Sequence, residues 1–99
     1  MEKLKPHYPL AEVKRLIRAG AVEVTIAAVI GAATLDLVYD DIVATALALT
    51  RDDFYKSMTS YTDHRSWQDV YNPEIAAGKR VYLKLTIKDE VLILSFKEL

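Results

Sequence analysis

Five side chains in two separate parts of the chain are of the types that can act on a phosphate group. Two come from the aromatic-rich stretch DFYKSMTSYTDHRSWQDVYNP at residues 53–73, and three come from the C-terminal segment after residue 80. Lysine stabilises the extra negative charge of a reacting phosphate, tyrosine carries or orients a proton, and glutamine fixes a nucleotide. Because the RNA 2′-hydroxyl supplies its own nucleophile, these side-chain types are sufficient to cleave RNA. The candidates are Lys56, Gln68, Tyr82, Lys84 and Lys97.

Other catalytic chemistries find little support in the sequence. The chain has no cysteine, which excludes disulfides, thiolate catalysis and cysteine-based zinc sites. It has no paired carboxylates, no histidine spacing typical of a metal site and no glycine-rich phosphate loop. His7 and His64 have no carboxylate at a spacing that would orient them. We therefore expect neither a metal nor a cofactor.

The same residues also have ordinary structural explanations. An exposed lysine such as Lys84 most often serves solubility, and a lone tyrosine such as Tyr82 is most often an amphipathic surface residue. Aromatic residues interleaved with polar ones, as at residues 53–73, fit either a half-buried sheet or a nucleic-acid-binding face. We expect the tyrosines of this stretch and Trp67 mainly to pack, and so to hold the two polar candidates of the stretch still.

The C-terminal sequence predicts a β-hairpin that positions three of the candidates. Apolar and polar residues alternate over residues 81–87, Lys88-Asp89-Glu90 makes the turn, and residues 91–96 return. A two-residue loop at Asp89-Glu90 sets the register, because a slip by one residue would destroy the apolar face. The expected pairs are Ile87–Leu92, Leu85–Leu94 and Leu83–Phe96 on the apolar face, and Tyr82–Lys97 and Lys84–Ser95 on the polar face.

The stretch at residues 53–73 predicts a second pair of strands. Thr50 to Asp53 has the composition of a capping box, and the residues that follow, 54–61, alternate as in a strand, although a helical period also fits them. We expect a strand there, a loop at 62–66, and a strand at 67–71 that ends before Asn72-Pro73. If both hairpins belong to one sheet, all five candidates can reach a common face.

The N-terminal half predicts the scaffold. Residues 21–50 contain no lysine or arginine, which suggests packing behind a sheet rather than contact with a polyanion. Gly31 is expected to weaken its helix by up to ~1 kcal/mol. The expected elements are a helix at 9–19, a strand at 22–25, a helix at 26–34 capped by Thr25, a connector at 35–39, and a helix from Asp40 or Asp41 to Leu49.

Length and charge limit the class of protein. Ninety-nine residues suit one α+β domain (residues 1–99), with N-terminal helices packed on a mainly antiparallel sheet. The net charge of −1 is lower than a nucleic-acid binder usually has, so an RNA site must be a local patch on the basic ends of the chain. The first ten residues lack the apolar region of a signal peptide, and the apolar run at 26–35 is too short to span a bilayer. We expect a cytoplasmic protein without a membrane partner.

Three segments of the chain resemble the motility quorum-sensing regulator (MqsR) toxin family. They are MEKLKPHYPLAEVKRLIRAG, DFYKSMTSYTDHRSWQDVYNP and VYLKLTIKDEVLILSFKE. The resemblance runs nearly from end to end, and only residues 21–50 are loosely matched. It implies a toxin of a type II toxin–antitoxin system with a fold similar to the RelE bacterial toxins. Such a toxin is an mRNA interferase, a sequence-selective and metal-independent endoribonuclease, whose partners are mRNA and a cognate antitoxin.

The resemblance also implies roles for individual residues. The family's catalytic lysine in FYKSM falls on Lys56, its glutamine in WQDVY on Gln68, its tyrosine in VYLK on Tyr82, and its lysine in SFKE on Lys97. We expect the remaining basic residues of this region to bind RNA, namely Lys84 and Arg80. A noncatalytic module that binds RNA or protein is the alternative function.

Overall fold

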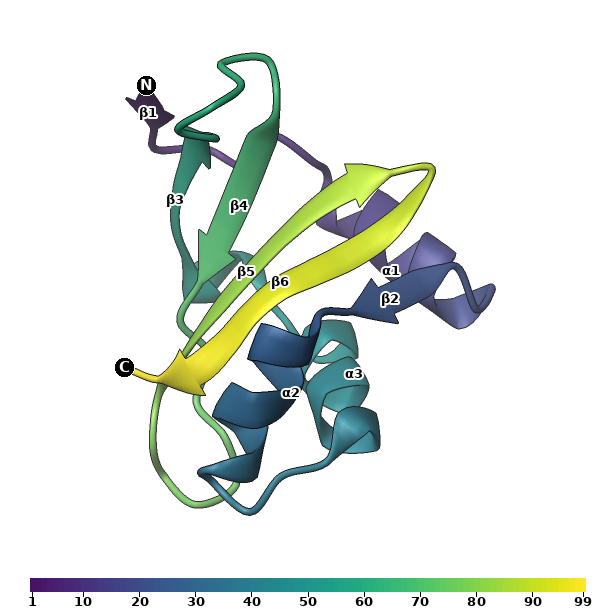
Figure 1. Cartoon of the computed structure of the whole chain (residues 1–99), viewed down its shortest axis with the longest axis vertical. Coiled ribbons are helices and arrows are strands. Elements are labelled where there is room, and N and C mark those ends of the chain that lie inside the picture. The colour runs from purple at the N-terminus through teal and green to yellow at the C-terminus, as the bar shows by residue number, and fades with distance from the viewer.

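A six-stranded sheet with helices on one face forms the molecule in a computed structural model that describes residues 1–99 (Figure 1). The strand order is β1-β3-β4-β5-β6-β2, and every neighbouring pair is antiparallel except β2 and β6. The α+β class predicted from the sequence is confirmed. The elements are β1 (Glu2–Lys3), α1 (Leu10–Arg18), β2 (Val22–Val24), α2 (Ile26–Ala33), α3 (Tyr39–Leu47), a 3₁₀ turn η1 (Arg51–Asp53), β3 (Phe54–Thr59), β4 (Trp67–Tyr71), β5 (Val81–Lys88) and β6 (Glu90–Glu98).

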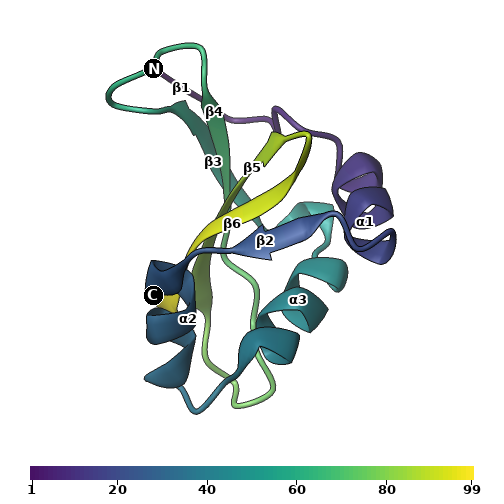
Figure 2. The same cartoon turned by 45° about the vertical axis from the view of Figure 1, so that its right-hand side comes forward.

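The core lies between the three helices and the inner face of the sheet. The turned view in Figure 2 shows the helices gathered on one side of the strands. Each helix contributes two fully or nearly buried aliphatic residues, and the central strands supply the rest. None of the helices is long and apolar enough to cross a membrane. The buried core residues are Val13, Ile17, Ala28, Ala32, Ile42, Ala46, Leu49, Tyr71, Val81, Leu83, Leu85, Val91, Ile93 and Phe96.

The first two helices lie where the sequence predicts them, within one residue at each end. Gly20 follows α1 with a φ of +80°, a conformation that ends a helix at little cost only for glycine. Thr25 caps α2, because its Oγ1 accepts a hydrogen bond from the Ala28 N–H at 3.2 Å. The same hydroxyl donates to the Leu94 carbonyl at 2.9 Å, which fixes the start of α2 on β6.

The third helix begins and ends earlier than predicted. Tyr39 is its first residue and Val38 its N-cap, so neither Asp40 nor Asp41 is the cap. Asp41 instead lies in the first turn, where its carboxylate accepts the Val38 N–H at 2.8 Å. The predicted C-terminus at Leu49 is also wrong, since the helix ends at Leu47. The sequence does not distinguish an aspartate at the N-cap from one in the first turn whose side chain bonds back to the N-cap, which is why the predicted start was wrong.

Gly31 is the point at which α2 crosses β6. A Cβ built on Gly31 would lie 1.9 Å from the Phe96 carbonyl oxygen and 3.4 Å from the Lys97 Cβ. The sequence predicts only a modest loss of helix stability from this glycine, whereas the structure shows that no side chain fits there. The close approach holds the C-terminal part of β6 against the helix.

We predict that Gly31→Ala destabilises the protein although alanine is the better helix former. Overpacking of a tight contact typically costs about 1–3 kcal/mol, and this contact is backbone on one side. We expect urea denaturation to show a loss of roughly 2 kcal/mol or more. Ala33→Gly, at an exposed position of the same helix, is the control and should cost about 1 kcal/mol. An increase in stability for Gly31→Ala would show that α2 does not cross β6 so closely.

The register of the β5–β6 hairpin is as predicted in one half and wrong in the other. Leu83 lies opposite Phe96, Tyr82 opposite Lys97 and Lys84 opposite Ser95, as expected. Nearer the turn the pairs are Leu85–Ile93 and Ile87–Val91, instead of Leu85–Leu94 and Ile87–Leu92. The physical reason is a β-bulge at Leu94, and Asp89 closes the turn with a φ of +66°. The bulge lets Phe96 and Ile93 face the core from the same strand.

A second bulge turns Lys56 away from the core. Phe54 lies opposite Tyr71, but Lys56 lies opposite Val70, so Tyr55 is the extra residue of β3. In a regular strand Phe54 and Lys56, two positions apart, would share a face, and the bulge places them on opposite faces. The strand ends at Thr59 rather than Tyr61, and the capping pattern before it closes η1, where Asp53 accepts the Thr50 N–H at 2.8 Å.

The aromatic residues of this region do not all pack, contrary to the prediction. Tyr71 is fully buried and stacks edge-on with Phe54 at 5.4 Å between ring centroids. Trp67 is half-buried and stacks on His7 at 5.2 Å. Tyr55 is 52% exposed and Tyr61 is 98% exposed, so the packing prediction is wrong for these two. Tyr55 is exposed because of the bulge, and Tyr61 because β3 ends before it.

A buried carboxylate fastens the N-terminal segment to the sheet. Asp69 in β4 is fully buried and accepts hydrogen bonds from the His7 N–H at 3.0 Å, the Tyr8 N–H at 2.9 Å and the Ser57 hydroxyl at 2.5 Å. An ion removed from water must be paired or hydrogen-bonded, and three donors meet that need here. These contacts lead the chain across the inner side of β4 before α1 begins.

We predict that Asp69→Asn lowers the free energy of unfolding by about 3 kcal/mol. The amide keeps one acceptor oxygen and presents an NH₂ group to donors that need an acceptor, and a hydrogen bond to a charged group contributes about 1.5–3 kcal/mol. Urea denaturation measures the effect. Asp63→Asn in the exposed loop between β3 and β4 makes the same chemical change and should stay within about 0.5 kcal/mol of wild type. Equal stability of both variants would contradict the role of Asp69.

Candidate active site

The predicted site residues gather on the face of the sheet that the helices leave open. One row of cross-strand partners runs from Lys56 in β3 through Val70 in β4 and Lys84 in β5 to Ser95 in β6. Because directly opposed residues of a sheet share a face, the two lysines flank Val70 on the same side. Lys56 and Lys84 therefore come together although 28 positions separate them in the sequence.

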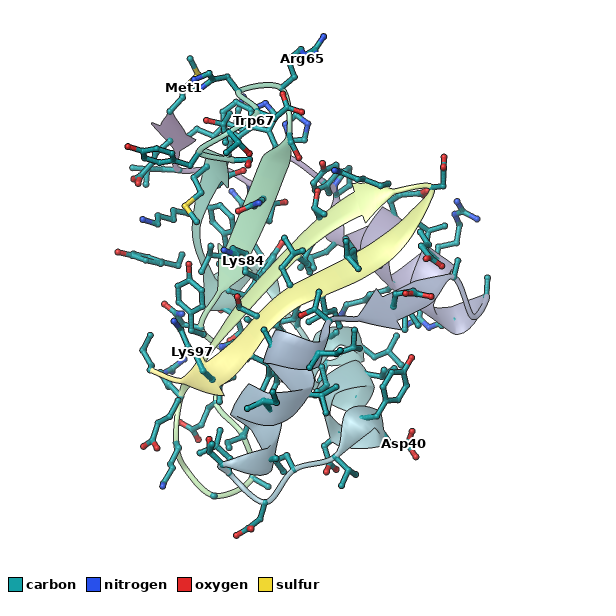
Figure 3. The ribbon with its side chains drawn as sticks, in the orientation of Figure 1. Met1, Asp40, Arg65, Trp67, Lys84 and Lys97 are labelled. Carbon is teal, nitrogen blue, oxygen red and sulfur yellow. The ribbon has the colours of Figure 1, made fainter.

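Neighbouring rows add the other predicted residues. Gln68 lies two residues from Val70 along β4 and opposite Met58, while Tyr82 lies two residues from Lys84 along β5 and opposite Lys97. Figure 3 shows Lys84 and Lys97 over the central strands, away from α1 and α3. The sequence predicts a common face only if both hairpins belong to one sheet. In the structure they do, and the candidates share that face.

Arg80 comes directly before β5, next to the end of the strand that carries Tyr82. Its guanidinium donates to the Asn72 carbonyl oxygen at 2.7 Å. The side chain is exposed. Residues 80, 82 and 84 are each two positions apart, so an extended chain places their side chains on the same face. Arg80 therefore extends the positive charge of this face.

Val70 forms an apolar floor beneath the charged side chains. It is fully buried, yet it is not part of the core cluster on the helix side of the sheet. The long side chains of the neighbouring strands cover it, since Lys56 and Lys84 are its cross-strand partners and are themselves half-buried. Such burial of lysine stems on an apolar residue keeps the ammonium groups at the surface while fixing where they emerge.

Charges within the site act on one another. Burial lowers the pKa of Lys84, and the nearby Lys97 ammonium lowers it further. The Lys97 Nζ lies 5.2 Å from the centre of the Tyr82 ring, and the Lys56 Nζ lies 5.3 Å from that of Tyr55. These are cation–π distances, in which an aromatic face holds an ammonium group without neutralising it.

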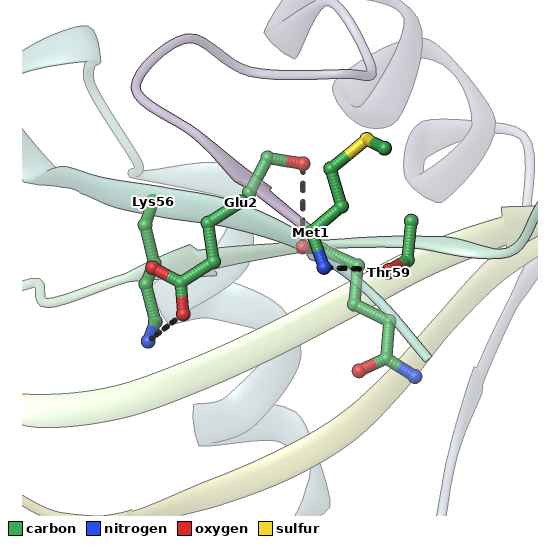
Figure 4. Close-up of polar contacts among 6 residues, drawn as sticks. Met1, Glu2, Lys56 and Thr59 are labelled. Atoms are coloured by element: carbon green, nitrogen blue, oxygen red, sulfur yellow. Dashed lines mark hydrogen bonds and ion pairs between the residues drawn. The ribbon is translucent and has the colours of Figure 1, made fainter. Parts of the chain in front are cut away.

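Lys56 has a partner that the sequence does not reveal. The Glu2 carboxylate lies 3.0 Å from the Lys56 Nζ, and this hydrogen bond is the main reason that the pKa of Lys56 is raised (Figure 4). Glu2 belongs to β1, which pairs with β3 beside Met58 and Ser57. A two-residue strand has no periodicity, so no pattern in the sequence could have placed Glu2 at the site.

The two histidines lie outside the site. His7 is on the inner side of the sheet, where its ring contacts Trp67 and its Nδ1 lies 2.8 Å from the Lys3 Nζ. Burial, followed by the charge of Lys3, lowers the pKa of His7. His64 is exposed in the loop between β3 and β4. No group of three or more His, Asp and Glu side chains comes close enough to hold a metal ion.

This arrangement suits a polyanion whose phosphate lies over Val70. Three lysines and an arginine supply positive charge, a phenol supplies a proton donor, and an amide supplies directional hydrogen bonds. A model of the family described as "Motility quorum-sensing regulator, toxin of MqsA" matches residues 5–98. The chain belongs to this family.

A relative in the motility quorum-sensing regulator family extends the match over the whole chain. The protein named mRNA interferase toxin MqsR from Escherichia coli (strain K12) is 49% identical over 98 residues, which cover 99% of each chain. The resemblance seen in the sequence is thereby confirmed.

We predict that Lys84 titrates at a lower pH than the other lysines of the protein. Burial and the neighbouring Lys97 both disfavour the ammonium form, so Lys84 loses its proton before an ordinary lysine as the pH rises. NMR titration of the lysine side chains measures this order. Lys97→Gln should move the titration of Lys84 upward, whereas Lys88→Gln at the exposed hairpin turn should leave it unchanged. An unshifted Lys84 in wild type would contradict the prediction.

Proposed function

We propose that this chain is an mRNA interferase toxin, a sequence-selective endoribonuclease that arrests growth by cutting mRNA. The observation that carries the proposal is the convergence of Lys56, Gln68, Tyr82 and Lys97 on one open face of the sheet. The name of the Escherichia coli relative, an mRNA interferase toxin, supports the same reading. The family description pairs these toxins with MqsA, so we propose an antitoxin of that kind as the partner.

The proposed reaction is attack of an RNA 2′-oxygen on the adjacent phosphorus, without a metal. It forms a 2′,3′-cyclic phosphate and releases a 5′-hydroxyl. Lys56 and Lys97 stabilise the additional negative charge of the transition state, which is the largest single contribution expected in such a site. Tyr82 assists proton transfer, and Gln68 fixes the nucleotide in line for attack.

The remaining basic residues of the face hold the RNA strand. Lys84 rises beside Val70, and Arg80 extends the face towards the loop that follows β4. Each contact to a phosphate releases counterions, so binding weakens as salt increases. We propose the cytoplasm as the place of action, since the substrate is mRNA.

We predict that Lys56→Ala and Tyr82→Phe abolish toxicity and slow RNA cleavage by roughly 100-fold or more, because each removes charge stabilisation or proton transfer in the transition state. The purified protein is incubated with a defined transcript in EDTA, and the cut sites and their 3′ ends are mapped. Lys88→Ala, which removes one positive charge at the hairpin turn, is the matched control and should cut like wild type.

The outcomes separate the two candidate functions. Cleavage in EDTA with cyclic-phosphate ends supports a metal-independent nuclease. Binding of the transcript without cleavage would favour the noncatalytic module instead. If Lys56→Ala and Tyr82→Phe both remained as toxic as wild type while folded, the site would be assigned wrongly.

A further inference from the structure

The N-terminal strand brings a carboxylate into the lysine-rich face. Of the 14 aspartate and glutamate residues, Glu2 alone forms an ion pair with one of the candidate side chains, Lys56. Glu98, the acid next to Lys97, pairs with Lys79 instead. The match to the family model covers residues 5–98 and so does not include Glu2.

Glu2 is held in place by the backbone around it. Glu2 lies opposite Met58 and Lys3 opposite Ser57, and the Thr59 N–H donates to the Met1 carbonyl at 2.9 Å. The Met1 amino group donates to the Thr59 hydroxyl at 3.2 Å, as Figure 4 shows. Met58 and Lys56 share a face of β3, so the diagonal contact from Glu2 to Lys56 follows from the pairing. The Glu2 side chain is 59% exposed, and a ligand can therefore reach its carboxylate.

The proposed reaction needs a group that accepts the proton of the 2′-hydroxyl. A lysine or tyrosine side chain ordinarily keeps its proton at neutral pH, whereas a glutamate is ordinarily ionised. The other candidate residues supply three ammonium ions, a guanidinium, a phenol and an amide, and the phenol of Tyr55 lies beside Lys56. Among these groups, the Glu2 carboxylate is the one whose side-chain type ordinarily accepts a proton at neutral pH.

Geometry places this carboxylate near the reacting oxygen. An ammonium has three donors, so Lys56 can hold a phosphate oxygen while it keeps the Glu2 contact at 3.0 Å. The attacking 2′-oxygen lies about 3–3.5 Å from phosphorus in a reactive conformation. A phosphate bound to Lys56 therefore brings its own 2′-hydroxyl within reach of the carboxylate bound to the same lysine.

We propose that Glu2 is a catalytic residue, the general base of the cleavage reaction, and this rests on the proposed function. Glu2 takes the proton of the 2′-hydroxyl as the 2′-oxygen–phosphorus bond forms and the bond from phosphorus to the 5′-oxygen breaks. The leaving 5′-oxygen takes a proton from the Tyr82 phenol. After release of the products, solvent carries the proton from Glu2 back to Tyr82, and the enzyme is restored without net change.

The test compares Glu2→Gln, Glu2→Asp and wild type on a labelled RNA oligonucleotide that spans a cleavage site mapped with wild type. We expect Glu2→Gln to lower kcat by about 100-fold or more with KM unchanged or lower, because a general base contributes roughly 10²–10⁴-fold. Glu2→Asp should keep a larger part of the activity. Glu12→Gln removes the same charge from α1, where Glu12 pairs only with Arg15, and should match wild type.

The pH profile gives a second readout that a structural role would not produce. The Glu2 carboxylate contacts Lys56 of β3, and the phenols of Tyr55 in β3 and Tyr82 in β5 act on the same lysine. The Met1 amino group, next to Glu2 in the chain, donates to Thr59. None of these groups is a carboxyl group. Wild-type kcat/KM should therefore rise with pH on the acidic side as one carboxyl group ionises. Glu2→Gln should lack this acidic limb.

Each result decides something. If wild type does not cut RNA, the proposed function fails, independently of Glu2. If wild type cuts and Glu2→Gln keeps full kcat, the general-base role is overturned. A higher kcat or a lower KM with unchanged kcat would also overturn it, and would identify Glu2 as a competitor for the phosphate site. If Glu2→Gln does not fold, the acidic limb of wild type compared with that of Glu2→Asp decides the question.

Discussion

The buried carboxylate of Asp69 is the interaction on which the geometry of this protein most depends. A charge inside a sheet is stable only if donors surround it, and here the donors come from β3 and from the segment before α1. These hydrogen bonds hold residues 7–8 against β4. The preceding segment, β1, then lies beside β3 and pairs with it. The Asp69 contacts on the inner side of the sheet thus help to place β1, and with it Glu2, beside Lys56 on the outer side.

Two β-bulges then decide which side chains face the solvent. The bulge at Tyr55 separates Phe54, which packs on Tyr71, from Lys56, which joins the open face. The bulge at Leu94 allows Phe96 and Ile93 to fill the core while Lys97 stays outside. Bulges of this kind redirect a side chain without interrupting a strand, and both occur in the strands that carry candidate lysines.

Much of the fold could be predicted from the sequence, because its signals are local. The alternation in β5 and β6 gave the hairpin, and the Tyr82–Lys97 and Lys84–Ser95 pairs were right since they lie beyond the bulge. The apolar pairs near the turn were wrong because an inserted residue has no signature in an alternating pattern. The role of Gly31 and the position of Glu2 were missed for a related reason, as both depend on a strand remote in sequence.

The parallel pairing of β2 with β6 has a consequence for how the chain folds during synthesis. Val22–Val24 can find their partner only when Val91–Ile93 have been made, and α2 rests on the same strand. Contacts so distant in sequence close late, because the loop between them must be ordered first. A nascent chain that lacks β6 has neither the strand that completes the core nor Lys97. The sheet face is therefore assembled only after nearly the whole chain has been translated.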